Sequence, residues 1–241
     1  SANISNVNIV NNVLSNSQNL SSVNGTTYAV NSTTAIHPTV MFDNNNYWTP
    51  QPSGRMIGLA GVNYTTLNVW SGFMMDDYFS ISADPSLTDS IDATPVLNSP
   101  AAWNNNGAGY PIPGLDTDIL GNPRSASVAN GPTDIGAFEY TPANGVNPAP
   151  ATPDVAPALN GTQVFWANGR PVAEIMWGAA GTVPTSVELT NFSGMSPDAN
   201  APGLVTGKSF WRATATGGSG YTYRIKFYYN PNSLGMLDEG L

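Results

Sequence analysis

A proline-rich segment in the middle of the chain most strongly limits how the chain can fold. Residues 141–157 contain five prolines, at positions 142, 148, 150, 153 and 157. Proline lacks an amide donor and biases the backbone toward extended polyproline geometry, so such a segment is not expected inside a hydrogen-bonded sheet. We therefore predict a linker over residues 141–158 that separates one domain at residues 1–140 from a second at residues 159–241.

The composition favours β structure on both sides of this segment. Only 10% of the 241 residues are charged, whereas glycine (24) and proline (20) are abundant and asparagine, serine and threonine are frequent. Helices are rich in Ala, Leu, Glu and Lys, so this composition is more typical of turn-rich strands. An all-β fold is the expectation. The chain also has no cysteine, which excludes disulfides, thiol catalysis and thiolate metal sites.

The charge balance limits the expected partners. Seven Lys and Arg residues stand against 16 Asp and Glu residues, which gives a net charge of −9, and the basic residues form no cluster. Nucleic acids and anionic membrane surfaces require such clusters, so neither is an expected partner. No apolar run has the length of a membrane span, so membrane insertion is not expected.

The first residues of the chain alternate between apolar and polar side chains. Within residues 4–14, Asn6, Asn8, Asn11 and Asn12 lie beside β-branched residues, and residues 28–30 and 39–42 have the composition of further strands. When short strands stack as successive coils, asparagines at equivalent corners form hydrogen-bonded ladders. We expect stacked coils with such ladders here.

Several short motifs follow in a fixed order. They are MFDNNNYW at 41–48, DPSL at 84–87, SPA at 99–101, TDILGNPR at 117–124 and DIGAFEY at 134–140. In this order they resemble the closing segment of extracellular parallel β-helix proteins of Bacteroidetes. The resemblance implies that residues 1–140 are the end of a right-handed parallel β-helix, with a cap at about residues 55–140. Only two or three coils fit before this cap and no N-terminal cap is recognisable, so we expect either that further coils precede Ser1 or that another chain covers the open edge. It also implies an extracellular or outer-surface location on a bacterium.

The second part contains five segments with period-two alternation. In residues 221–227, for example, Thr222, Arg224 and Lys226 alternate with aromatic and aliphatic residues. This pattern predicts an antiparallel β-sandwich with strands at 161–167, 171–177, 186–190, 209–215 and 221–229. Residues 203–229 and 237–239 are also similar to a β-sandwich module of the same Bacteroidetes exoproteins. That resemblance implies that the module is truncated at Leu241.

Charged residues in the closing motifs are candidates for structural and metal-binding roles. The resemblance implies that Arg124 pairs with a carboxylate such as Asp134 or Asp118 and locks the cap. Asp116 and Asp118 stand two residues apart, so their oxygens can converge on a hard cation such as Ca²⁺, the single cofactor that the sequence suggests. The alternative is that these aspartates close turns through side-chain to backbone hydrogen bonds.

The first part lacks the residues used by sugar-cleaving β-helix enzymes. It contains no lysine, two arginines (Arg55 and Arg124) and one histidine, His37. His37 has no second histidine or glutamate at ligand spacing, which favours a turn or surface role, and the chain has no Gly-x-Ser-x-Gly motif. We predict no catalytic residues and lean against an enzyme.

Aromatic residues offer a carbohydrate-binding hypothesis. Tyr47, Trp48 and Trp103 adjoin runs of asparagine and are therefore candidates to stack on sugar rings, although aromatic residues in strands more often fill the core. The sequence as a whole favours a non-catalytic structural or adhesive segment of an exported bacterial cell-surface protein. Self-association, or contact with other surface-protein chains, is expected at open strand edges. Two alternatives remain open: the C-terminal fragment of a polysaccharide lyase or glycoside hydrolase, and a carbohydrate-binding module with polysaccharide as its partner.

Overall fold

The computed structural model describes residues 5–17, 27–33, 36, 38–50, 55–89, 91–195, 207–235 and 237. Strands predominate over helices and form several separate sheets, so the chain is mostly β, as its composition predicts. Within the described ranges, no helix is long and apolar enough to cross a membrane.

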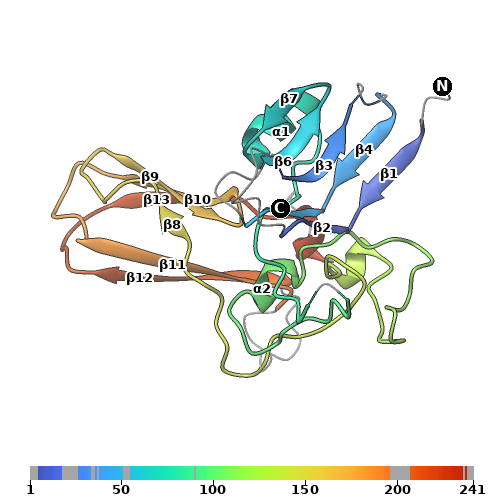
Figure 1. Cartoon of the computed structure of the whole chain (residues 1–241). Helices are drawn as coiled ribbons and strands as arrows, with labels where there is room; N and C mark the ends of the chain where they lie inside the picture. Colours follow the sequence, from blue (N-terminus) through green and yellow to red (C-terminus); the bar gives the residue numbers. More distant parts are fainter. Residues whose placement is uncertain are drawn as a thin grey trace.

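Parallel strand pairs organise the first part of the chain (Figure 1). The three pairs are β1 (Val7–Val10) with β4 (Val40–Asp43), β2 (Val13–Ser15) with β5 (Asn46–Trp48), and β3 (Tyr28–Ser32) with β6 (Arg55–Leu59). A seventh strand, β7 (Val62–Tyr64), adds to β6 in the antiparallel sense. The strands predicted from alternation at the start of the chain are therefore confirmed.

Asparagines at the corners between these strands form the predicted ladder. The backbone N–H and the side-chain amide of Asn12 both donate to Oδ1 of Asn45, each at 3.0 Å, across 33 residues of sequence. The backbone N–H of Asn45 donates in turn to Oγ of Ser80 at 2.7 Å, and Asn46 forms a parallel bridge with Ile81. Three successive passes of the chain thus stack at one corner, and their polar groups satisfy one another.

A short helix covers the apolar side of these strands. In α1 (Leu67–Met74), the hydroxyl of the N-cap residue Thr66 accepts from the Val69 N–H, and the helix ends at Met75, whose backbone is left-handed. Leu67 and Trp70 lie three residues apart on one face and are buried against strand residues such as Phe42 and Tyr64. The all-β prediction missed this helix, whose apolar spacing spans only two turns.

Most of residues 76–150 are irregular. Two short elements interrupt the loops: the helix α2 (Ala102–Asn105) and the 3-10 turn η1 (Val128–Asn130). Backbone groups here bond mainly to side chains and to other loops, as when the Gly109 N–H donates to the Thr133 carbonyl at 2.7 Å. Such a segment holds its shape through specific polar contacts.

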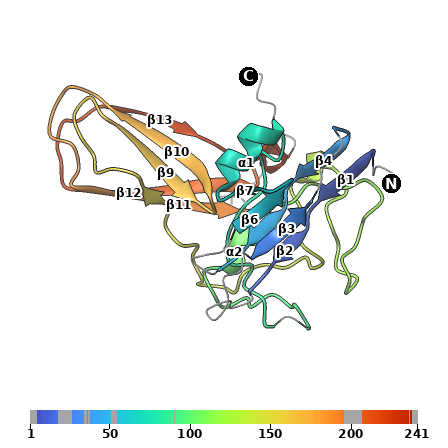
Figure 2. The same cartoon turned by 45° about the horizontal axis from the view of Figure 1, so that its top comes forward.

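Antiparallel sheets form the second part (Figures 1 and 2). One sheet has the order β13–β10–β9–β8, and the other pairs β11 with β12. The bounds of these strands are β8 (Thr152–Pro153), β9 (Thr162–Ala167), β10 (Arg170–Trp177), β11 (Ser186–Ser193), β12 (Ser209–Thr216) and β13 (Tyr223–Phe227). The 3-10 turn η2 (Pro231–Leu234) follows the last strand. Both sheets contribute to one buried cluster that includes Phe165, Ile175 and Leu189. All five strands predicted in this part are confirmed.

The proline-rich segment differs from its expected role as a linker outside the sheets. Thr152 and Pro153 pair with Trp166 and Phe165 as β8, and Ala151 is buried in the neighbouring core. The strand lies at the edge of its sheet, where the missing N–H of a proline breaks no ladder. The second half of the segment therefore belongs to the sheet structure.

Candidate functional site

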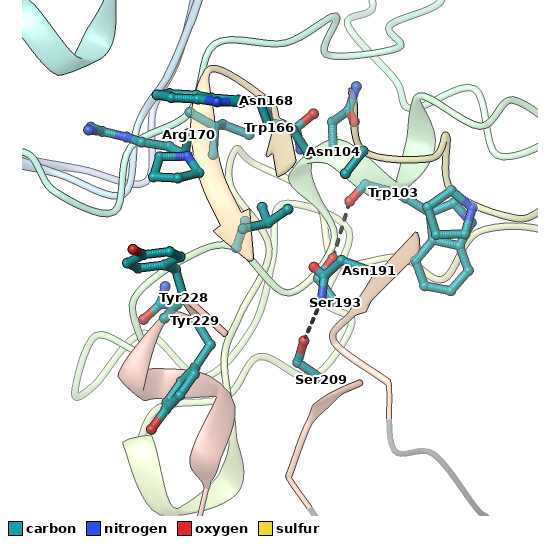
Figure 3. Close-up of a pocket in the computed structure, with 18 of the residues that line it drawn as sticks. Trp103, Asn104, Trp166, Asn168, Arg170, Asn191, Ser193, Ser209, Tyr228 and Tyr229 are labelled. Atoms are coloured by element: carbon teal, nitrogen blue, oxygen red, sulfur yellow. Dashed lines mark hydrogen bonds between the residues drawn. The ribbon is translucent and has the colours of Figure 1, made fainter. Parts of the chain in front are cut away.

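A cleft of about 770 Å³ lies between the irregular region of the first part and the sheets of the second. It falls in the size range of small-ligand pockets, roughly 300–1,000 Å³. Figure 3 shows residues from distant segments around it, including Asn104 in α2, Trp166 on β9 and Tyr229 after β13. The two parts of the chain build this site jointly.

The turn between β9 and β10 fixes one end of the cleft. Asn168 and Gly169 both have left-handed backbones, with φ of 53° and 77°, as a tight hairpin turn requires. The turn docks on the first part, where the Ser82 N–H donates to the Asn168 carbonyl at 2.8 Å. The Arg170 guanidinium donates to the carbonyls of Ser80, at 2.8 Å, and Asp77.

A second set of contacts joins the two parts of the chain at the end of β11. Oγ of Ser193, at the end of β11, donates to the Asn106 carbonyl at 2.5 Å, and the Asn106 amide donates to the Ser193 carbonyl at 2.6 Å. Phe192 packs edge-on against Trp103, with ring centroids 5.4 Å apart. Because polar and aromatic contacts act together, the cleft walls are preorganised.

Asp77 lies in the turn after α1. A buried cluster of polar side chains holds this turn in place. The Asp77 carboxylate, which is fully buried, accepts from the Tyr47 hydroxyl at 2.8 Å, from Nε1 of Trp70 at 2.6 Å and from the Ser80 hydroxyl. Burial raises the pKa of Asp77, although these donors and the nearby Arg170 act in the opposite direction. Burial and the adjacent Asp77 also raise the pKa of Tyr47, which keeps that hydroxyl a donor. We call these residues the Asp77 cluster.

Aromatic side chains form much of the cleft lining. On β9, Gln163 and Phe165 are buried, so the alternation of the strand directs Trp166 to the opposite face, toward the cleft. Trp166 is half-buried, lines the cleft and makes no ring contact with any described aromatic residue. The other aromatic lining residues are Tyr78, Phe79, Trp103, Trp211, Phe227, Tyr228 and Tyr229.

Amide side chains supply the polar part of the lining. They are Asn68, Asn104, Asn168, Asn191 and Asn230. Each amide offers both donors and acceptors, the pairing that hydroxyl-rich ligands need. Arg170 is the single charged residue among the described lining residues, and its guanidinium is already bonded to backbone carbonyls. The described lining thus contains no carboxylate pair for acid–base hydrolysis.

The aromatic residues singled out from the sequence have different positions from those expected. Tyr47 is fully buried in the Asp77 cluster, and Trp103 is 7% exposed with its Nε1 bonded to the Val146 carbonyl at 2.9 Å. Tyr47 therefore presents no open face, whereas Trp103 lies in the lining of the cleft, and the sugar-stacking role of both rings stays a prediction. Trp48 is half-buried and lines a different cavity, so its sugar-binding role stays a prediction.

The two closing motifs meet around Arg124, but with a different partner from the one expected. Nε of Arg124 forms an ion pair with Glu139 at 2.7 Å, and Nη2 donates to the carbonyls of Asp134 and Gly136, each at 2.9 Å. Arg124 therefore pairs with a carboxylate, as expected, but this carboxylate is Glu139 rather than Asp134 or Asp118. Glu139 lies nearer because the backbone between residues 134 and 139 wraps around the guanidinium.

The predicted metal ligands lie at a turn. The Asp118 carboxylate accepts from the backbone N–H groups of Leu120, Asn122 and Glu139 and from the Asn122 amide. Desolvation acts to raise the pKa of Asp118, but these donors outweigh it and lower the pKa to about 2. Asp116 is exposed, and no group of three or more His, Asp or Glu residues within the described ranges is arranged to hold a metal ion. The turn-closing alternative accounts for Asp118, and Ca²⁺ binding stays a prediction.

Asp134 has the more unusual environment of the two cap residues. Its carboxylate is 4% exposed and accepts from the N–H groups of Gly107 at 2.7 Å and Tyr140 at 2.9 Å. Burial, followed by repulsion from Glu139, raises the pKa of Asp134 from 3.8 to about 7. A carboxyl with a raised pKa retains its proton longer in the folded state than in the unfolded state.

The pKa of Asp134 is higher in the folded state than in the unfolded state, so the unfolded chain loses the Asp134 proton first as the pH rises. The free energy of unfolding is therefore expected to fall between about pH 4 and about pH 7. The Asp134→Asn variant removes the titration, so its stability is expected to decline less steeply over the same interval. Urea unfolding at a series of pH values measures both slopes. Identical slopes in the two proteins would show that Asp134 is ionised throughout.

Trp166, Tyr228 and Arg170 were not singled out from the sequence as site residues. They lie in or beside strands with ordinary alternation, and the segments that complete the cleft are distant in sequence. His37 lies outside the described residues. Comparison with known proteins found no matching family model, no matching curated protein and no matching solved structure.

Proposed function

We propose that this chain is a non-catalytic adhesive segment of an exported bacterial surface protein and that it binds neutral carbohydrate in the cleft. The observation that carries the proposal is the lining, which combines aromatic rings with asparagine amides and, among the described residues, contains no carboxylate. Aromatic faces pack against the C–H faces of sugar rings, and amides bond to hydroxyl groups. A few placed polar groups on an apolar wall are typical of a ligand site.

The charge of the site selects among carbohydrates. The chain carries a net charge of −9, and the single cation of the cleft is occupied by the carbonyls of Ser80 and Asp77. An acidic polysaccharide would meet repulsion without a free cation to offset it. A neutral glycan therefore fits the site better.

The parallel pairs support the structural half of the proposal. Stacked in-register pairs with an asparagine ladder are the units of a parallel β-helix, and the two antiparallel sheets with a common core are those of a β-sandwich. Among the described strands, β1, β2 and β3 each have one strand partner, so their other edges are where another coil or another chain would pair. Self-association through these edges stays a prediction.

Replacing Trp166 with alanine tests the binding function. Loss of the stacking face is expected to weaken binding of a neutral oligosaccharide by about tenfold or more, since tenfold corresponds to about 1.4 kcal/mol. A panel of neutral oligosaccharides on the intact chain identifies the best ligand, and isothermal titration compares the variants. Tyr110→Ala is the control, because Tyr110 is 43% exposed and lies outside the cleft lining.

Two results would contradict the proposal. One is the absence of any neutral oligosaccharide that binds the intact chain. The other is equal loss of affinity in the Trp166 and Tyr110 variants, which would show that binding does not take place in the cleft.

A further inference from the structure

A second cavity, of about 790 Å³, lies apart from the cleft. Its walls come from the β2 segment, from the loop at residues 84–95 and from residues 135–140 of the closing motif. Exposed residues such as Ser15, Asp84 and Asp89 line it, so the cavity is open to solvent. It shares no lining residue with the cleft.

Two carboxylates give this cavity a negative character. Oδ1 of Asp84 accepts from the Ser86 N–H at 2.8 Å, and Oδ1 of Asp89 accepts from the N–H groups of Ile91 and Asp92, each at 2.7 Å. These bonds fix both side chains in their turns. The hydrogen bonds from Asp92 and Ile91 also lower the pKa of Asp89, which keeps it ionised. No lysine, arginine or histidine is among the described lining residues.

Trp48 adds an aromatic surface to the same cavity. It ends β5, beside Ser15, and its half-buried ring makes no contact with another described aromatic ring. Asn12 and Asn105 also line the cavity, but the Asn12 amide donates to Val10 and Asn45, and Oδ1 of Asn105 accepts from the Asn46 amide. A cation is attracted both to the face of an indole and to carboxylates, and a sugar ring packs on the same indole face.

We infer that this cavity binds an amino sugar, with the ring of the sugar on Trp48 and its ammonium group between Asp84 and Asp89. The ligand class is a cationic glycan with free amino groups. This ligand is cationic, whereas the glycan proposed for the cleft is neutral. The two sites therefore bind different carbohydrates on one chain.

The alternative class of ligand is a basic peptide. Its lysine side chain also suits two carboxylates, but it does not need the indole face. The geometry favours the sugar, because the carboxylates and the indole line one cavity.

Titration with the glucosamine trimer tests the inference. The intact chain is expected to bind this trimer at low ionic strength, and to bind the fully N-acetylated trimer at least about tenfold more weakly, because acetylation removes the charge. The Asp84→Asn, Asp89→Asn double variant is expected to lose at least about tenfold in affinity. Asparagine retains the Oδ1 acceptor at both turns, so the variant keeps these turns closed.

Matched controls separate this site from general charge and from the cleft. The Asp92→Asn, Asp116→Asn variant removes two exposed charges outside the cavity and should bind the glucosamine trimer normally. Trp48→Ala should weaken that binding, whereas Trp166→Ala should not, so failure of one site does not imply failure of the other. Equal affinity for the acetylated trimer, equal affinity for a trilysine peptide, or no effect of Trp48→Ala would each overturn the inference.

Discussion

Replacing Arg124 with alanine is expected to lower the free energy of unfolding by about 3–5 kcal/mol, the range for breaking a buried ion pair from one side. The Arg124 side chain is 6% exposed, and the partner Glu139 is 17% exposed. Glu139 also accepts from the Thr133 hydroxyl and from the Asp134 N–H at 3.0 Å. Without the guanidinium, this carboxylate remains partly buried beside Asp134, and two backbone carbonyls lose their donor.

Urea unfolding followed by circular dichroism measures this loss. Arg224→Ala is the matched control, because Arg224 is exposed on β13 and is expected to change stability by less than about 0.5 kcal/mol. An Arg124→Ala midpoint equal to that of the control would contradict the proposed role of the ion pair. Glu139→Gln should lose less than Arg124→Ala, because the amide oxygen still accepts hydrogen bonds.

The fold could be predicted from the sequence wherever the alternation of residue types matches the alternation of buried and outward side chains. In β9, Gln163 and Phe165 alternate with outward residues, so period two was visible in the sequence. The asparagine corners were visible for a related reason, because Asn11 and Asn44 adopt left-handed backbones that asparagine tolerates better than most residues. The helix α1 was missed, since its two buried apolar residues, Leu67 and Trp70, give too short a period to distinguish from a strand.

The candidate site was less predictable because tertiary contacts create it. Tyr47 lies in an asparagine-rich run, which suggested exposure, yet its hydroxyl has a partner in Asp77, 30 residues away. Such a partner allows a polar ring to be fully buried. Trp166 showed only strand alternation, and the wall opposite it comes from residues more than fifty positions earlier. The motif that contains Arg124 could be recognised in the sequence. Its ion-pair partner, Glu139, could not be predicted, because that pairing depends on the path of the backbone.

The Asp77 cluster provides the second large effect. Asp77→Ala is expected to lower the free energy of unfolding by about 3 kcal/mol or more, because three buried donors, on Tyr47, Trp70 and Ser80, lose their acceptor at about 1–3 kcal/mol each. Asp77 also has a φ of 63°, which alanine tolerates poorly. Urea unfolding of the variant measures the total.

Asp77→Asn separates the hydrogen bonds from the charge. Asparagine tolerates the left-handed backbone, its oxygen still accepts from Tyr47 and Trp70, and the Ser80 hydroxyl can rotate to accept from the new amide. Burial raises the pKa of Asp77, so removal of the charge also removes a desolvation cost. The asparagine variant is therefore expected to retain most of the stability that alanine loses. If both variants lose the same amount, the negative charge itself, acting on Arg170, holds the two parts together.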